Sequence, residues 1–98
     1  MAEKWTIQLT KRAKKDLDDL QSERGKVLRA LLRLEQTPME GHPLAGSLRG
    51  ARALEFSLPG GAYRAAYIVN MDDHVCLVFL IGPHENFYEK AERRYRAL

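Results

Sequence analysis

The sequence predicts a small α+β domain, and two observations support this prediction. The chain has 98 residues, of which 45% are hydrophobic and 30% are charged, and this is the size and balance of one compact domain. Apolar residues recur with helical spacing in the first part of the chain and with strand spacing in the second. The expected fold is a single domain over residues 1–98. It has a small antiparallel sheet, an N-terminal helical hairpin packed on it and a C-terminal helix, with the helices on one side of the sheet.

The N-terminal part predicts one strand followed by the helical hairpin. Apolar and polar residues alternate over residues 5–9, as in a half-buried strand. Thr10 is a good cap for a helix with an apolar stripe, and Ser22 is a good cap for a second helix that ends before Pro38. Residues 37–50, rich in proline and glycine, then predict an irregular connection.

The second half predicts three strands and a closing helix. Strand patterns occupy residues 52–58, 63–70 and 75–81, and the sequence Pro-Gly-Gly at 59–61 predicts a turn between the first two. The third segment is almost continuously apolar, which predicts the central strand, covered on both faces. The closing helix is expected from residue 86 to residue 96.

Composition limits the classes of function. Cys76 is the only cysteine, so no intramolecular disulfide can form and a reducing cytoplasm is expected. No apolar stretch reaches the ~20 residues of a membrane span. The formal net charge of +3 permits a polyanionic partner. Because no phosphate-binding loop and no zinc pattern of cysteine and histidine occurs, we expect no metal and no nucleotide cofactor.

Several ionisable side chains lie at predicted strand ends and loops, where the hydrophobic pattern does not account for them. Pairing across the turn at 59–61 places Glu55 near Arg64, and His84 follows the last strand. Histidine titrates near pH ~6.5 and serves as acid or base, while the arginine fork matches phosphate oxygens. Such a set suits RNA cleavage by attack of the 2′-hydroxyl on the phosphate. The full set is His42, Arg49, Arg52, Glu55, Arg64, His84, Glu85 and Tyr88.

The same residues have structural interpretations, which the sequence leaves open. Glu55 and Arg64 are also a plausible salt bridge, since a charge inside a strand needs a partner or a ligand. His84 is equally suited to capping or packing at a helix start. His42 fits a surface position in a loop, and Tyr88 fits either the core or a stacking contact with a base.

Three segments resemble the RelE/ParE superfamily of bacterial toxins: residues 43–50 (PLAGSLRG), 62–69 (AYRAAYIV) and 81–88 (IGPHENFY). These toxins belong to type II toxin-antitoxin modules, and the predicted order of elements agrees with their fold. The resemblance implies a ribosome-dependent mRNA endonuclease that cuts codons in the ribosomal A site without a metal. It also implies a cognate antitoxin, and it leaves open whether the toxin-antitoxin complex binds operator DNA.

The resemblance also implies roles for individual residues. Arg64 matches the strand arginine that contacts the scissile phosphate, and His84 matches the histidine that YoeB-like members carry as candidate general acid. Tyr88 falls near the tyrosine of the last helix in RelE. His42 occupies the place of the glutamate base in YoeB-like members.

The chain departs from the family pattern at two places. RelE-like members have lysines where this chain has Ala53 and Glu55, and the RelE arginine after the last strand is replaced around His84 and Glu85. The chain therefore resembles a histidine-bearing variant with Glu55 or His42 as base and His84 as acid. Its phosphate contacts would be Arg49, Arg52 and Arg64. The alternatives are a ParE-like inhibitor of DNA gyrase and a non-catalytic interaction module of the same fold.

Overall fold

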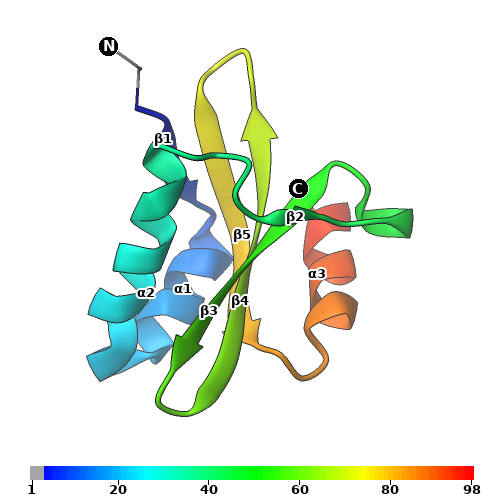
Figure 1. Ribbon diagram of the computed structural model, residues 1–98. Coiled ribbons are helices and arrows are strands. Elements are labelled where there is room, and N and C mark those ends of the chain that lie inside the picture. Colours follow the sequence, from blue (N-terminus) through cyan, green and yellow to red (C-terminus); the bar gives the residue numbers. More distant parts are fainter. Residues whose placement is uncertain (1–3) are drawn as a thin grey trace.

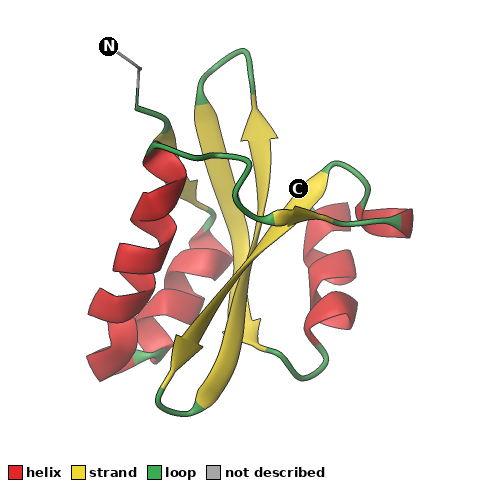
Figure 2. Cartoon of the chain, in the orientation of Figure 1, coloured by secondary structure: helices red, strands yellow, loops and turns green. Residues whose placement is uncertain are grey.

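The computed structural model describes residues 4–98, and it confirms the predicted α+β class (Figures 1 and 2). The order of elements is as predicted, with one additional two-residue strand before the hairpin. Short 3₁₀ turns occupy residues 21–23, 33–35 and 46–48. None of the helices in the described part is long and apolar enough to cross a membrane. The elements are β1 (Thr6–Leu9), α1 (Lys11–Asp19), α2 (Arg24–Leu32), β2 (His42–Pro43), β3 (Ala51–Leu58), β4 (Gly61–Asn70), β5 (Val75–Pro83) and α3 (Phe87–Arg96).

The five strands form one mixed sheet in the order β1-β5-β4-β3-β2. The strands β2 to β5 pair antiparallel, whereas β1 pairs parallel with the first half of β5, from Val75 to Val78. The prediction that residues 75–81 form the central strand is wrong, because β4 occupies the middle. The segment is apolar throughout because helices cover both of its faces.

The helices cover opposite faces of the sheet, so the expectation of helices on one side is wrong (Figure 1). Successive side chains of a strand point to opposite faces. Ala65 and Tyr67 of β4 accordingly lie in the core under α1 and α2, whereas Ala66 and Ile68 pack in a second core under α3. The fold is therefore a sheet between two helical layers.

The two predicted helix caps have different outcomes. The Thr10 hydroxyl accepts a hydrogen bond of 3.1 Å from the backbone N–H of Ala13, which confirms the first cap. The Ser22 cap is wrong, because Ser22 lies inside a 3₁₀ turn that runs directly into α2. Glu23 precedes α2, and its side chain makes no capping hydrogen bond.

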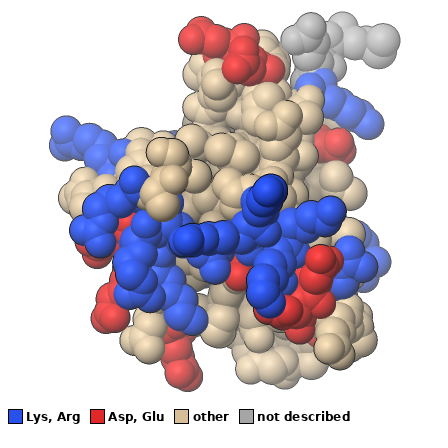
Figure 3. Space-filling model, turned by 180° about the vertical axis from the view of Figure 1, so that it is seen from behind, with Lys and Arg blue, Asp and Glu red and all other residues tan. Residues whose placement is uncertain are grey.

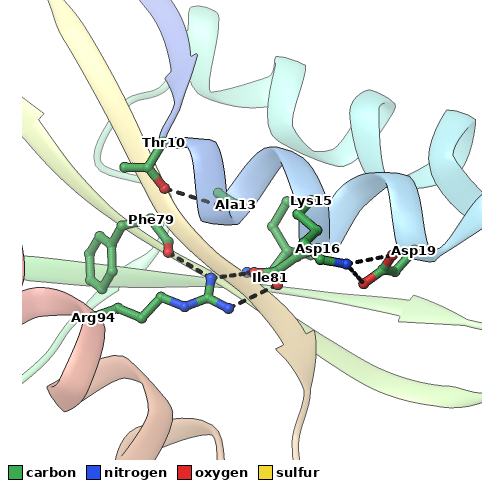
Figure 4. Close-up of polar contacts among 8 residues, drawn as sticks. All are labelled: Thr10, Ala13, Lys15, Asp16, Asp19, Phe79, Ile81 and Arg94. Atoms are coloured by element: carbon green, nitrogen blue, oxygen red, sulfur yellow. Dashed lines mark hydrogen bonds and ion pairs between the residues drawn. The ribbon is translucent and has the colours of Figure 1, made fainter.

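An ion pair between α1 and α3 closes the edge of β5 beyond the end of β1 (Figure 4). Asp16 accepts a hydrogen bond of 3.0 Å from the backbone N–H of Ile81 and one of 3.0 Å from Nη2 of Arg94. Nη1 of Arg94 donates to the carbonyl of Phe79 at 3.1 Å. Two side chains from opposite faces thus replace the missing strand at this edge.

We expect Arg94→Ala to lower the free energy of unfolding by about 2–4 kcal/mol, measured by urea denaturation. The substitution leaves the largely buried Asp16 carboxylate, 16% exposed, without its charged partner. The control is Asp19→Ala, which breaks the Lys15–Asp19 pair, whose side chains are 77% and 66% exposed. It should cost less than about 0.5 kcal/mol. Equal losses for the two variants would contradict this account of the edge.

Cys76 is fully buried in the core. Burial raises the pKa of the thiol from 9.0 to about 11. Because only the thiolate is nucleophilic, the native protein should not react with a disulfide reagent at pH 8, whereas urea-unfolded protein should react fully. The unfolded thiol ionises first, so stability should fall as the pH rises from 9 toward 11. Rapid labelling of native protein would contradict this prediction.

Candidate functional site

The register of the central strands places Glu55 and Arg64 on the α3 face of the sheet. Arg64 of β4 lies between Glu55 of β3 and Gly82 of β5, and it points to the same face as Ala66, which packs under α3. An added Cβ at Gly82 would meet no atom within 4 Å. The sheet face beside Arg64 is therefore open on the β5 side.

The guanidinium of Arg64 is held from two sides. Its Nε and Nη2 lie 3.3 Å and 3.2 Å from Oε1 of Glu55, which confirms the predicted pairing of these two residues. Its Cζ lies 5.2 Å from the centre of the Tyr88 ring, a cation–π contact. Nη1 is buried and has no hydrogen-bond partner among the described residues. A buried donor without a partner is costly, and an anionic ligand would satisfy it once an exposed neighbour such as the Tyr88 side chain turns aside.

Tyr88 lies in the first turn of α3 and is 41% exposed. Its ring meets the buried ring of Phe87 edge to face, with centroids 5.8 Å apart. The sequence left open whether Tyr88 joins the core or remains available for stacking. In the structure its ring rests on the core through Phe87 and contacts Arg64, while much of its surface remains open to solvent.

His84 lies in the loop between β5 and α3, and it is exposed. Its backbone N–H donates to the carbonyl of Ala62 at 3.0 Å, and its carbonyl accepts from the N–H of Phe87 at 3.4 Å. These bonds fix the backbone beside the strand that carries Arg64. No hydrogen bond or ion pair within residues 4–98 joins the His84 imidazole to Arg64 or Glu55.

His42 belongs to β2, so it is a strand residue rather than part of an irregular loop. It pairs with Ala53 of β3, and paired residues of antiparallel strands share a face of the sheet. His42 therefore lies on the Arg64 face, one cross-strand row away from Glu55. Its side chain is exposed.

Arg52 lies on the opposite face from Arg64, so the structure does not bring these two predicted phosphate contacts together. Its Nε donates to the carbonyl of Gly41 at 2.7 Å, and its Nη2 donates to the carbonyl of Met39 at 3.1 Å. Arg52 thus holds the segment that leads into β2. The hydrophobic pattern could not reveal this role because the carbonyl partners are backbone atoms.

Tyr67 supports the same segment, a role that the hydrophobic pattern of the sequence does not mark. Its hydroxyl accepts from the N–H of Gly41 at 2.9 Å and donates to the carbonyl of Pro38 at 2.8 Å. Burial raises the pKa of Tyr67, which keeps the phenol protonated. A Cβ at position 41 would approach the Tyr67 ring to 2.8 Å. The sequence signal that could have identified Tyr67 is a tyrosine among apolar residues of a strand, because a buried hydroxyl needs hydrogen-bond partners.

Arg49 is exposed and lies near the far end of α3. Its carbonyl accepts a hydrogen bond of 2.8 Å from the Tyr95 hydroxyl in the last turn of that helix. Tyr88, which contacts Arg64, lies in the first turn. The length of α3 therefore separates Arg49 from Arg64, and the predicted set of three arginines does not form one cluster.

The arrangement around Arg64 can bind a phosphodiester and move protons. The guanidinium provides a charged donor, and the Glu55 carboxylate can accept a proton. His42 lies in the row on one side of this pair, and the backbone of His84 is bound to Ala62 on the other side. The exposed Tyr88 ring offers a surface for a base. Within residues 4–98, no group of three His, Cys, Asp or Glu side chains is placed to hold a metal ion.

We expect Glu55→Ala to lower the free energy of unfolding by about 1–3 kcal/mol, because it removes the charged partner of a largely buried guanidinium. The Arg64 side chain is 13% exposed and the Glu55 side chain 57%, so Arg64 keeps only its contact with Tyr88 in this variant. Urea denaturation measures the loss, and Asp19→Ala, which breaks a pair exposed on both sides, is the control. A loss no larger than that of Asp19→Ala would contradict this account of the pair.

Comparisons with known proteins give one family and a group of similar structures. Residues 6–92 match the family model described as the ParE-like toxin of type II bacterial toxin-antitoxin systems. An Escherichia coli RelE mutant in the free state has a TM-score of 0.73 and 23% identity, with 97% of this chain and 99% of that chain covered. No curated protein sequence matches.

Two further structures are similar to this chain. The toxin-antitoxin complex RelBE2 from Mycobacterium tuberculosis contains a chain with a TM-score of 0.73 and 21% identity, with 83% of this chain and 99% of that chain covered. The YoeB/ParE toxin from Agrobacterium tumefaciens has a TM-score of 0.67 and 18% identity, with 81% and 98% covered. At these identities the likeness shows a common fold.

Proposed function

This chain belongs to the ParE-like toxin family of type II bacterial toxin-antitoxin systems, and from that premise we propose that it is a metal-independent endoribonuclease that cleaves mRNA on the ribosome. The observation that supports this activity most is the environment of Arg64. Its guanidinium is fixed by Glu55 and Tyr88, while Nη1 remains without a hydrogen-bond partner in the described chain. A phosphate oxygen suits this donor, and it reaches Nη1 when the partly exposed Tyr88 side chain turns aside.

The proposed reaction is an internal transfer at the scissile phosphate. A base removes the proton of the 2′-hydroxyl, the 2′-oxygen bonds to phosphorus, and the bond from phosphorus to the 5′-oxygen breaks. The leaving oxygen takes a proton from an acid, so the products are a 2′,3′-cyclic phosphate and a 5′-hydroxyl. Arg64 stabilises the charge on the phosphate oxygens, His84 is the acid, and Tyr88 stacks on a base next to the cleaved bond.

Glu55 and His42 are the two candidates for the base. The Glu55 carboxylate lies 3.2 Å from Nη2 of Arg64, so a phosphate bound by Arg64 would lie next to it. His42 lies in the adjoining row of the same face and would reach the 2′-hydroxyl from the β2 side. Substituting each residue alone separates them, since loss of a general base lowers the cleavage rate by about 10²–10⁴-fold.

The proposed partners follow from the family and from complexes of similar toxins. RelB-RelE complexes from Escherichia coli and Pyrococcus horikoshii share the fold, which supports a cognate antitoxin for this chain. Because the toxin is basic, the antitoxin segment that covers it should be rich in acidic and apolar residues. The other proposed partners are the ribosome with mRNA in its A site, and operator DNA bound by the complex. The proposed location is the cytoplasm.

A second candidate function is inhibition of DNA gyrase, which is the activity that the resemblance to ParE implies. The ParE-like description of the matching family favours this candidate. It requires no acid or base, and it agrees with the lack of a direct contact between His84 and Arg64 in residues 4–98. In this function Arg64 would bind the protein or DNA surface of the target.

We expect Arg64→Ala and His84→Ala to lower mRNA cleavage at least about 100-fold in induced cells, because each removes a group that acts on the phosphate or the leaving oxygen. Primer extension on mRNA from cells with and without an inhibitor of translation measures the cuts. Arg29→Ala, on the exposed side of α2, is the matched control and should cleave normally.

Three results would overturn the proposal. Cleavage at the normal rate by the His84→Ala variant would show that His84 is not the general acid. DNA breaks without mRNA cuts would assign the gyrase function instead. Unchanged growth on induction of the unmodified chain would indicate a non-catalytic interaction module.

A further inference from the structure

A second basic region lies away from Arg64, where α1 and α3 meet beside the edge of β5. Figure 3 shows Lys and Arg side chains gathered across this side of the molecule. A hollow of about 260 Å³ between the two helices is lined by Lys11 and Arg12 of α1 and by Arg94 of α3, among others. We call the basic seam the set of Lys11, Arg12, Lys90, Arg93 and Arg94.

The cations of the basic seam are available for a ligand, with one exception. Arg94 is bound to Asp16 and to the carbonyl of Phe79, so it is part of the fold. Lys11, Arg12 and Arg93 are exposed, and no ion pair with another described residue holds them. The nearby carboxylates of Asp16 and Asp19 already pair with Arg94 and Lys15. Glu89 and Glu92 of α3 lie beside Lys90 and Arg93. The four remaining cations outnumber these two carboxylates, so the local charge of the seam is positive.

The position of Arg93 extends the basic seam along α3. Arg93 follows Lys90 by three positions, so the two side chains are neighbours on the helix surface. Lys90 and Arg94 together line the adjoining hollow between α1 and α3. The cations thus form a continuous row that crosses from one helical layer to the other, rather than a point site for one small anion.

The aromatic rings beside the basic seam are engaged within the protein. Phe79, which lines the hollow beside Lys11 and Arg12, is 1% exposed and stacks on Tyr95 with ring centroids 5.5 Å apart. Tyr63, which lines the adjoining hollow, is partly exposed and stacks on Phe56 with ring centroids 6.4 Å apart. Proteins that bind single strands use aromatic side chains on which bases stack. A row of cations whose neighbouring rings already stack on protein side chains suits phosphates that a paired helix presents, with its bases turned inward.

We propose that the basic seam binds the sugar-phosphate backbone of a double-helical nucleic acid. The Arg64 site is different in kind, since there one oriented arginine lies beside a partly exposed tyrosine, which suits an unpaired strand. RNA and DNA duplexes share the backbone chemistry that the seam recognises. Binding at the seam requires no cleavage, so it is independent of the proposed endonuclease activity.

The test compares two triple variants of the full chain. Lys11→Gln/Arg12→Gln/Arg93→Gln removes three charges from the basic seam. Lys26→Gln/Arg29→Gln/Arg33→Gln, called the α2 variant, removes three from α2 and the turn that follows it. Both variants have the same net charge, and thermal melting confirms that both are folded. Affinities for an RNA duplex, for the DNA duplex of the same sequence and for single-stranded RNA are measured over a range of salt concentrations.

The seam variant should bind duplex at least tenfold more weakly at about 0.1 M salt, and the slope of log K against log[salt] should fall by about 2–3. The α2 variant should change affinity less than about threefold. Loss on the RNA duplex alone would assign RNA as the ligand, whereas equal loss on both duplexes would assign the shared backbone.

Equal losses for both variants, no loss for the seam variant, or a loss confined to single-stranded RNA would each overturn the proposal. Arg64→Ala should leave duplex affinity within about threefold, and a larger loss would also overturn it, because the duplex would then bind at the Arg64 site. If the chain passes these tests but cleaves no mRNA, the proposal for the basic seam stands and the proposed endonuclease function fails.

Discussion

The Asp16–Arg94 ion pair at the edge of β5 is the interaction on which the arrangement of the two helical layers depends. One side chain comes from α1 and the other from α3, and both also bind the backbone of β5. Strand edges with free backbone groups invite pairing with other chains, and this pair blocks that edge. The ion pair also joins α3 to the sheet. It therefore holds in place the helix whose Tyr88 side chain contacts Arg64.

The α3 face of the sheet combines well-packed side chains with an arginine, Arg64, that has one donor without a hydrogen-bond partner in the described chain. Phe87 and Ala91 of α3 are fully packed against the sheet, which positions the first turn of the helix. On the other face, Tyr67 and Arg52 bind the segment before β2 and so position His42. Between these supports lies Arg64, whose Nη1 lacks a partner in the described chain. Functional sites commonly concentrate such locally unfavourable features, which a ligand relieves.

The sequence predicts the elements of this fold well because their causes are local. Alternation of apolar residues, the turn at 59–61 and the Thr10 hydroxyl all act within a few positions, and the first two also place Glu55 opposite Arg64. The face that α3 covers and the middle position of β4 depend on long-range pairing, which periodicity does not encode. Asp16 and Arg94 stand 78 positions apart, and neither shows a pattern in the sequence that would reveal the contact.

The central claim is that the guanidinium of Arg64 binds the phosphate of an RNA strand, and arginine side-chain NMR tests it most directly. The Nε–H signals of the protein can be followed during titration with a short RNA that carries a 2′-deoxy nucleotide and resists cleavage. The account predicts that the Arg64 signal shifts while that of Arg52, whose guanidinium is bound to backbone carbonyls, stays in place. An unmoved Arg64 signal at saturating RNA would contradict the account.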